Sequence, residues 1–265
     1  MLAYIRRMCR LFIEFNHTNV KKTIMDFLGQ SIQKKKNTPG IDNYRDQVGH
    51  IDGFGLAWFV DGKWKTYKST ELYTDDPKLP PIIRNIPKSV VVGHIRKKKY
   101  GKKAIVNVHP FSFENQIFMQ NGYINDFPQH ISKIKEAIFP EYIQHIVGGT
   151  DTECLFFLYL TCKRRTKNNV DAFAQMFHLF KQWNIELVAN IVYANDTDIV
   201  ITRYFYYDQS QYDTKQYPLS LYWNISSSNG LLIASEPIQD AITMIPENTI
   251  ISLNHETGQM DEYRI

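Results

Sequence analysis

The chain has 265 residues, of which 43% are hydrophobic and 14% aromatic, and this composition predicts a folded globular protein. The net charge of +4 falls short of the basic balance of a dedicated nucleic-acid binder, and three cysteines argue against a disulfide framework. The sequence has no run of the ~20 apolar residues that a membrane span needs, and charges near its start interrupt any signal peptide. We therefore expect a cytoplasmic protein that does not enter a membrane.

The first half of the chain predicts a helix and a two-stranded ribbon. Residues 19–33 carry apolar side chains at helical spacing. Residues 55–69 alternate apolar and polar side chains around Asp61-Gly62, a dipeptide typical of a tight β-turn. The polar segment 38–53 and the proline-rich segment 74–89 are expected to connect elements without supplying core.

The second half repeats this plan of helices between ribbons. Apolar spacing predicts helices over 132–139, 151–161 and 170–183, and Thr150 with Glu153 forms a capping-box pattern that would begin the second of them. Antiparallel strands spread along a chain without internal repeats indicate layered sheets covered by helices. The sequence shows no boundary between independent halves. Further ribbons are predicted to turn at 195–198, 229–230 and 257–258.

The pair Met8-Cys9 has the form of a protein's start, although it lies within the chain. If synthesis began at Met8 and this methionine were removed, Cys9 would carry both a thiol and a free α-amine. These groups titrate near pH ~8.5 and ~8, so the amine can act, through a water, as the base that activates the sulfur. Taken alone, the pair is better explained as two apolar residues of a first strand.

Five further short stretches place polar residues or glycine among apolar strands. Each taken alone has a structural explanation: a turn, a buried histidine or the start of a helix. Their order along the chain is what singles them out. The stretches are DGFG (52–55), HIRKK (94–98), NVHPF (107–111), QNG (120–122) and TDTE (150–153).

Together with MCRLF (8–12) and SEP (235–237), these stretches resemble the class II glutamine amidotransferase domain of the N-terminal-nucleophile hydrolases. The resemblance is closest to the stand-alone amidotransferase-like branch and runs from Met8 nearly to the last residue. It implies an α+β fold, a four-layer αββα sandwich of two antiparallel sheets flanked by helices. It also implies one such domain over residues 9–265, after an N-terminal extension of residues 1–8.

The resemblance implies a chemistry that needs neither metal nor cofactor. Cys9 corresponds to the nucleophile that attacks the γ-amide of glutamine or of another γ-glutamyl compound, forms a thioester and releases ammonia or an amine, after which water yields glutamate. Asn121 and the backbone N–H of Gly122 correspond to the donors that stabilise the oxyanion. The substrate is thus a small molecule.

Charged residues in the same motifs imply how that substrate is held. Arg96 corresponds to the cation that binds the α-carboxylate, and Asp151 to the anion that binds the α-ammonium. His94 and His109 are candidates for a supporting shell around the site.

The chain departs from the family pattern at three places. Gln120 stands where a histidine is usual, Phe54 replaces a tryptophan, and lysines crowd the segment 97–103. These lysines either alter the substrate tail that is accepted beyond the glutamyl group or form only a solvated loop, and we favour the solvated loop. Residues 1–7 are the largest departure, because an amide nitrogen on Cys9 cannot act as a base. A start at Met8, a cleaved propeptide and a catalytically silent relative all remain open, and we favour the first.

The sequence leaves other classes of protein function open. The chain could be a silent amidotransferase-like binding protein or regulatory subunit. Basic runs such as 163–167 could contact nucleic acid, but acidic residues nearly balance the cations, so this is not expected. No HExxH motif or Cys/His cluster indicates a metal site, and Cys154 and Cys162 are expected in the core. As an enzyme, the protein could pass ammonia to a separate synthase or partner subunit, or hydrolyse γ-glutamyl compounds by itself.

Overall fold

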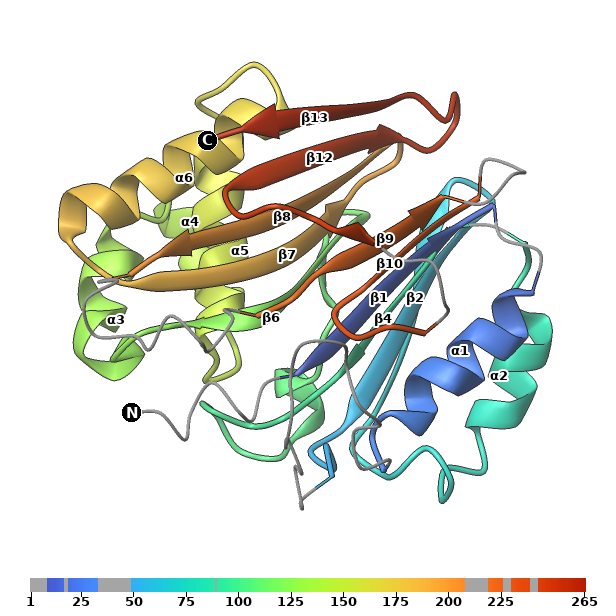
Figure 1. Cartoon of the computed structure of the whole chain (residues 1–265). Coiled ribbons are helices and arrows are strands. Elements are labelled where there is room, and N and C mark those ends of the chain that lie inside the picture. The colour runs from blue at the N-terminus through green and yellow to red at the C-terminus, as the bar shows by residue number, and fades with distance from the viewer. Residues whose placement is uncertain are drawn as a thin grey trace, which may run out of the picture.

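The computed structural model describes residues 9–16, 19–32, 49–88, 90–207, 219–225, 230–238 and 243–265. Two antiparallel sheets lie face to face, and helices cover the outer face of each sheet (Figure 1). This is the α+β sandwich of four layers that the sequence predicts. The extension 1–8, most of the segment 38–53 and Asn229 of the predicted turn lie outside the described residues.

Sheet A has seven described strands and carries β1 near its centre. All six residues of β1 are buried, as expected for a strand covered on both faces. In spatial order the strands are β11 (Thr243–Met244), β9 (Tyr222–Ile225), β10 (Leu231–Ala234), β1 (Arg10–Phe15), β4 (Val91–Ile95), β2 (Phe54–Val60) and β3 (Lys63–Ser69).

Sheet B has six described strands, and its long central hairpin joins β7 to β8. The predicted turns at 195–198 and 257–258 connect strands of this sheet, as the sequence indicates. In spatial order the strands are β13 (Met260–Arg264), β12 (Thr249–Asn254), β8 (Asp198–Tyr206), β7 (Leu187–Ala194), β6 (Gln116–Ile124) and β5 (Phe111–Phe113).

Six α-helices of the described chain form the two outer layers. Two of them pack on sheet A, and the others lie on the side of sheet B (Figure 1). A third apolar cluster fills the space between the sheets. None of the described helices is both long and apolar enough to cross a bilayer. The helices are α1 (Val20–Gly29), α2 (Leu79–Asn85), α3 (Phe127–Glu136), α4 (Pro140–Ile143), α5 (Asp151–Lys163) and α6 (Asn169–Trp183).

Local sequence signals account for the ends of several elements. Asp61 and Gly62 both adopt positive φ, which a type I′ turn between β2 and β3 requires. The hydroxyl of Thr150 accepts a hydrogen bond from the backbone N–H of Glu153, so α5 begins where the capping pattern predicts. The carboxylate of Glu153 reaches further back, to the N–H groups of Val147 and Gly148.

The expectation that segment 74–89 supplies no core is wrong. Residues 79–85 form α2, and its Leu79 and Ile83 are buried against sheet A. Pro80 and Pro81 lie in the first turn, where the backbone N–H groups have no partner within the helix, so proline costs nothing there. The prolines that suggested a loop thus mark the start of a helix.

One carboxyl group is buried beneath the helices of sheet A. Glu14 is the penultimate residue of β1, has no exposed surface and lies on the face that α1 covers. Burial raises the pKa of Glu14 to about 7, and a hydrogen bond with Thr23 of α1 opposes this rise. The folded protein therefore keeps the proton of Glu14 to a higher pH than an exposed glutamate would.

Replacing Glu14 with glutamine should alter the pH dependence of folding stability. An unfolded chain releases the glutamate proton near pH ~4.3, whereas the folded parent keeps it to higher pH, so the parent loses stability as pH rises between these values. We expect the free energy of unfolding of Glu14→Gln, relative to the parent, to increase by roughly 2–3 kcal/mol from pH 4.5 to pH 8 in urea titrations. A difference that stays constant with pH would show that Glu14 is ionised in the folded protein.

Candidate active site at the open edge of a strand

The candidate residues gather along one edge of β6. Among the described strands, β5 pairs only with residues 116–118 of β6, so the same edge from 119 to 124 has no neighbouring strand. In an antiparallel sheet, the backbone groups of alternate residues point to the same edge. Those of Gln120, Gly122 and Ile124 therefore point away from β7 together, and each polar group needs a partner other than a strand.

Two buried histidines bind the backbone of Gln120 at this edge. Nε2 of His94, on β4 of sheet A, lies 3.0 Å from the carbonyl oxygen of Gln120 and donates to it. Nδ1 of His109 accepts from the N–H of Gln120 at 3.4 Å. The two rings lie 4.0 Å apart, and burial lowers the pKa of each, to about 3 for His94. Both histidines are therefore neutral, and they connect sheet A, through His94, and the segment before β5, through His109, to the residue before Asn121.

The backbone of Ile124 is bound two positions after Gly122. Its N–H donates to Oδ2 of Asp151 at 2.9 Å, and its carbonyl accepts from the hydroxyl of Tyr100 at 3.1 Å. The N–H of Gly122 thus points outward between two positions whose partners are fixed. Asp151 is the first residue of α5 and is nearly buried, with its other oxygen bound to the N–H of Thr152. Burial raises the pKa of Asp151, and these backbone bonds oppose the rise.

Cys9 enters this cluster from sheet A. β1 pairs with β4 so that Arg10 lies opposite Ile95, which places Cys9 beside the end of β4. Its Sγ accepts a hydrogen bond from the N–H of Lys97 at 3.3 Å and contacts the carbonyl oxygen of the same residue at 3.4 Å. Burial raises the pKa of the Cys9 thiol to about 11, although the N–H of Lys97 and the positive charge of Arg96 lower it. The thiol is therefore neutral at pH 7.

Arg96 organises the loop that follows β4. Its buried guanidinium donates to the carbonyls of Tyr100 and Lys102, at 2.9 and 3.2 Å, and keeps further N–H donors beyond these two bonds. Burial lowers the pKa of Arg96, and the ionised form of Cys9 and the carboxylates of Asp52 and Asp151 oppose this change. Arg96 and Asp151 in turn shift the pKa of the Cys9 thiol, so the three groups are electrostatically coupled.

Asn121 and Gln120 point to opposite faces of β6, because side chains alternate along a strand. The Oδ1 atom of Asn121 is buried and has no hydrogen-bond partner among the described residues. The side chain of Gln120 donates to the carbonyl of Val188 and accepts from the hydroxyl of Thr152, both at 3.0 Å. The glutamine that departs from the family pattern therefore links β6, β7 and α5.

The lysine-rich segment is only partly the solvated loop that we expected. Lys98, Lys102 and Lys103 are exposed, but Lys97 and Lys99 are half-buried. The backbone of Lys97 contacts the thiol of Cys9, and sequence patterns carry no signal for a contact made by backbone atoms. Lys99 is a second residue that the sequence analysis did not place in the site.

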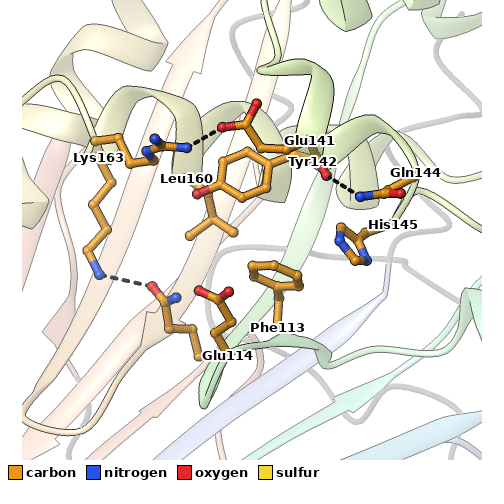
Figure 2. A pocket seen from close by; sticks show the side chains of 10 residues that line it. Phe113, Glu114, Glu141, Tyr142, Gln144, His145, Leu160 and Lys163 are labelled. Carbon is orange, nitrogen blue, oxygen red and sulfur yellow. Dashed lines mark hydrogen bonds and ion pairs between the residues drawn. The ribbon is translucent and has the colours of Figure 1, made fainter.

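Two surface hollows lie away from these residues. One, of about 540 Å³, opens between the β5–β6 turn, α4 and the end of α5 (Figure 2). In it Lys163 donates to Gln116, and Arg164 pairs with Glu141. The other, of about 440 Å³, lies beside the β2–β3 and β5–β6 turns.

Neither hollow is lined by a candidate residue, and no cysteine lies in either lining. We therefore assign the site to the buried cluster around Cys9. Within the described ranges, no group of three His, Cys, Asp or Glu residues is arranged to hold a metal ion.

Comparison with known proteins assigns this fold to a family. The family model of the class-II glutamine amidotransferases matches residues 38–215, and the chain belongs to this family. Its fold is that of the N-terminal-nucleophile hydrolases, as in the glutamine phosphoribosylpyrophosphate amidotransferase of B. subtilis. That structure covers 97% of this chain with a TM-score of 0.63 at 16% identity, and the match spans 49% of its own length.

Two further relatives are similar to this chain. The probable glutamine amidotransferase DUG3 of Saccharomyces cerevisiae is 32% identical over 122 residues, which are 41% of this chain and 32% of the yeast protein. The chain thus matches about a third of that relative's length. A glutamine aminotransferase class-II domain protein from Silicibacter pomeroyi has a TM-score of 0.64 at 16% identity, over 97% of this chain and 99% of its own. At such identity, the two solved structures support the fold alone.

A side chain at Gly122 should disrupt the central strands. A Cβ atom there would lie 2.0 Å from the backbone carbonyl oxygen of Val188 on β7, so one strand would have to move. We expect Gly122→Ala to lower the free energy of unfolding by about 2 kcal/mol or more in urea titrations.

Gly149→Ala is the matched control for this variant, because its Cβ would meet its nearest neighbour, Cα of Gly101, at an ordinary 3.4 Å. It should change stability by no more than about 0.5 kcal/mol. Equal losses in the two variants would contradict the close approach of β6 and β7.

Proposed function

We propose that the protein is an N-terminal-nucleophile amidohydrolase that cleaves the γ-amide of glutamine, or of another γ-glutamyl compound, through Cys9. One observation carries the proposal. The pKa of the buried Cys9 thiol is shifted by two cations, Arg96 and Arg10, and by one anion, Asp151, which binds the open edge of β6. Membership of the class-II glutamine amidotransferases supports the same reaction class.

The environment of Cys9 calls for a base. With a pKa of about 11 the sulfur is protonated at neutral pH, and a neutral thiol is a weak nucleophile. His94 and His109 are occupied by the backbone of Gln120, so neither serves as that base. In a chain that begins at Cys9, the α-amine of the same residue accepts the thiol proton, and we therefore place the working N-terminus at Cys9.

The reaction then proceeds in two balanced steps. The Cys9 sulfur attacks the δ-carbon of the substrate as its proton passes to the α-amine, and the tetrahedral intermediate collapses by breaking the C–N bond, with that proton leaving on ammonia or an amine. Water, deprotonated by the same α-amine, attacks the thioester, and the thiol and glutamate are released. Asn121 and the N–H of Gly122 donate to the oxyanion in both steps, and loss of one such donor costs about 10²–10³ in rate.

The charges of the site select the substrate. Arg96 offers spare N–H donors to an α-carboxylate, and Asp151 offers a carboxylate held on α5 and β6 to an α-ammonium. A compound with both free groups, glutamine or a γ-glutamyl derivative, satisfies both charges. An internal peptide amide satisfies neither.

The proposal extends to the compartment of the protein and to a partner subunit. The three cysteines are buried and free, which suits the reducing cytoplasm. The exposed residues Ile105, Val106 and Val147 near the loop after β4 suit a partner subunit that receives ammonia. A silent binding protein of the same fold is the alternative, and it would bind glutamine without cleaving it.

The form of the chain expressed from Met8 should release glutamate from glutamine, whereas Cys9→Ala in that form should be inactive, because it lacks the nucleophile. Cys162→Ala is the matched control, since it also removes a buried thiol, one that lies on α5 and away from the proposed reaction. We expect the rate of this variant to stay within about twofold of the parent. Glutamate release is measured in a coupled assay in which the released glutamate is oxidised. Turnover by Cys9→Ala at the parent's rate would exclude Cys9 as the nucleophile.

Asp151→Asn should reduce the preference for a free amino group. We expect kcat/KM for glutamine to fall by about 10- to 100-fold, because the ammonium loses its counter-ion. The value for N-acetylglutamine, which has no ammonium, should change by less than about threefold. Parallel losses for both compounds would assign Asp151 a purely structural role.

A further inference from the structure

Lys99, which has no role in the proposed reaction, contacts β6 next to the residue that binds Asp151. Lys99 is half-buried in the loop after β4, and its Nζ lies 3.5 Å from the centroid of the Tyr123 ring. Tyr123 lies between Gly122 and Ile124, whose N–H donates to Asp151. Lys99 thus contacts Tyr123, and Asp151 binds the backbone of Ile124, the next residue along the same strand.

The two charges act on each other in this buried region. The positive charge of Lys99 lowers the pKa of Asp151, and the negative charge of Asp151 raises that of Lys99. Among the described groups, the charges of Asp151 at the start of α5 and of Asp126 before α3 act on Lys99, and its ammonium lies over the rings of Tyr100 and Tyr123. The protein itself thus supplies a cation whose charge acts on Asp151.

We propose that Lys99 competes with the α-ammonium group of the substrate for Asp151, and thereby weakens and tunes substrate binding. This inference rests on the role that the proposed function gives to Asp151. Two ammonium groups near one buried carboxylate repel each other, and the repulsion is strong where water is scarce. The substrate must displace the Lys99 side chain toward solvent, which a long flexible side chain on a loop permits.

The competition depends on pH, because only the charged form of Lys99 competes. Burial lowers the pKa of Lys99 to about 8, and Asp151 and Asp126 oppose this change. Below pH 8 the lysine is mainly charged and opposes the substrate. Above pH 8 it loses its charge, and the affinity for the substrate rises.

Lys99→Met tests the competition through KM for glutamine, measured from pH 6 to pH 9 in the form expressed from Met8, which keeps every residue that the structure describes. We expect KM at pH 6.5 to fall about three- to tenfold relative to the parent, with kcat within about twofold. The gap between the two proteins should close above pH 8.5. Lys99→Arg, which stays charged, should keep the parent's KM at pH 6.5 and hold it at pH 9.

Lys98→Met is the matched control, because Lys98 is adjacent and exposed and should leave KM unchanged. If KM of Lys99→Met equals or exceeds that of the parent at pH 6.5, the proposal is overturned. Calorimetric titration of glutamine into the Cys9→Ala form, with and without Lys99→Met, separates this inference from the proposed function. Tighter binding with Lys99→Met supports the competition even where no variant hydrolyses glutamine, and equal binding in both forms refutes it. Absence of glutamine binding in both forms contradicts the proposed function, and with it this inference.

Discussion

The open edge of β6 is the constraint on which the site depends. Where β5 ends, the backbone groups of the longer strand lose their strand partners, and the protein replaces those partners one by one. His94 and His109 take the two groups of Gln120, and Asp151 takes the N–H of Ile124. These replacements come from sheet A, from the segment before β5 and from α5. Because the backbone groups at this edge of β6 need hydrogen-bond partners, three parts of the fold come together around Gly122.

Burial then sets the charge state of each group in the site. Desolvation keeps His94, His109 and the Cys9 thiol neutral at pH 7. A neutral imidazole can both donate and accept, so the two histidines can bind a carbonyl and an N–H of the same residue. In the proposed reaction, the neutral thiol needs a base, and the α-amine of an N-terminal Cys9 supplies it. Burial raises the pKa of Asp151 and lowers that of Arg96. Backbone hydrogen bonds and the charge of Lys99 oppose the change at Asp151, and nearby acidic groups oppose the change at Arg96.

Sequence signals predicted features that depend on neighbouring residues. Asp61-Gly62 specified its turn and Thr150 the start of α5, because both act through backbone groups a few residues away. The order of the motifs indicated the family and the fold. The proline-rich segment misled because proline suits both a loop and the first turn of a helix, and only packing on sheet A decides for α2. Contacts across sheets, such as His94 with Gln120, and the placement of Lys99 over Tyr123 arise from tertiary packing, for which a single sequence has no pattern.

Covalent labelling with a glutamine analogue tests the central claim most directly. An analogue with a diazoketone in place of the γ-amide keeps the α-carboxylate and α-ammonium and reacts with a nucleophile at the cleavage position. The protein expressed from Met8 is incubated with it at pH 7, digested and mapped by mass spectrometry. The account predicts one adduct, on Cys9, which excess glutamine prevents, and unmodified Cys154 and Cys162. An adduct on another residue, or none on Cys9 in a folded protein, would contradict it.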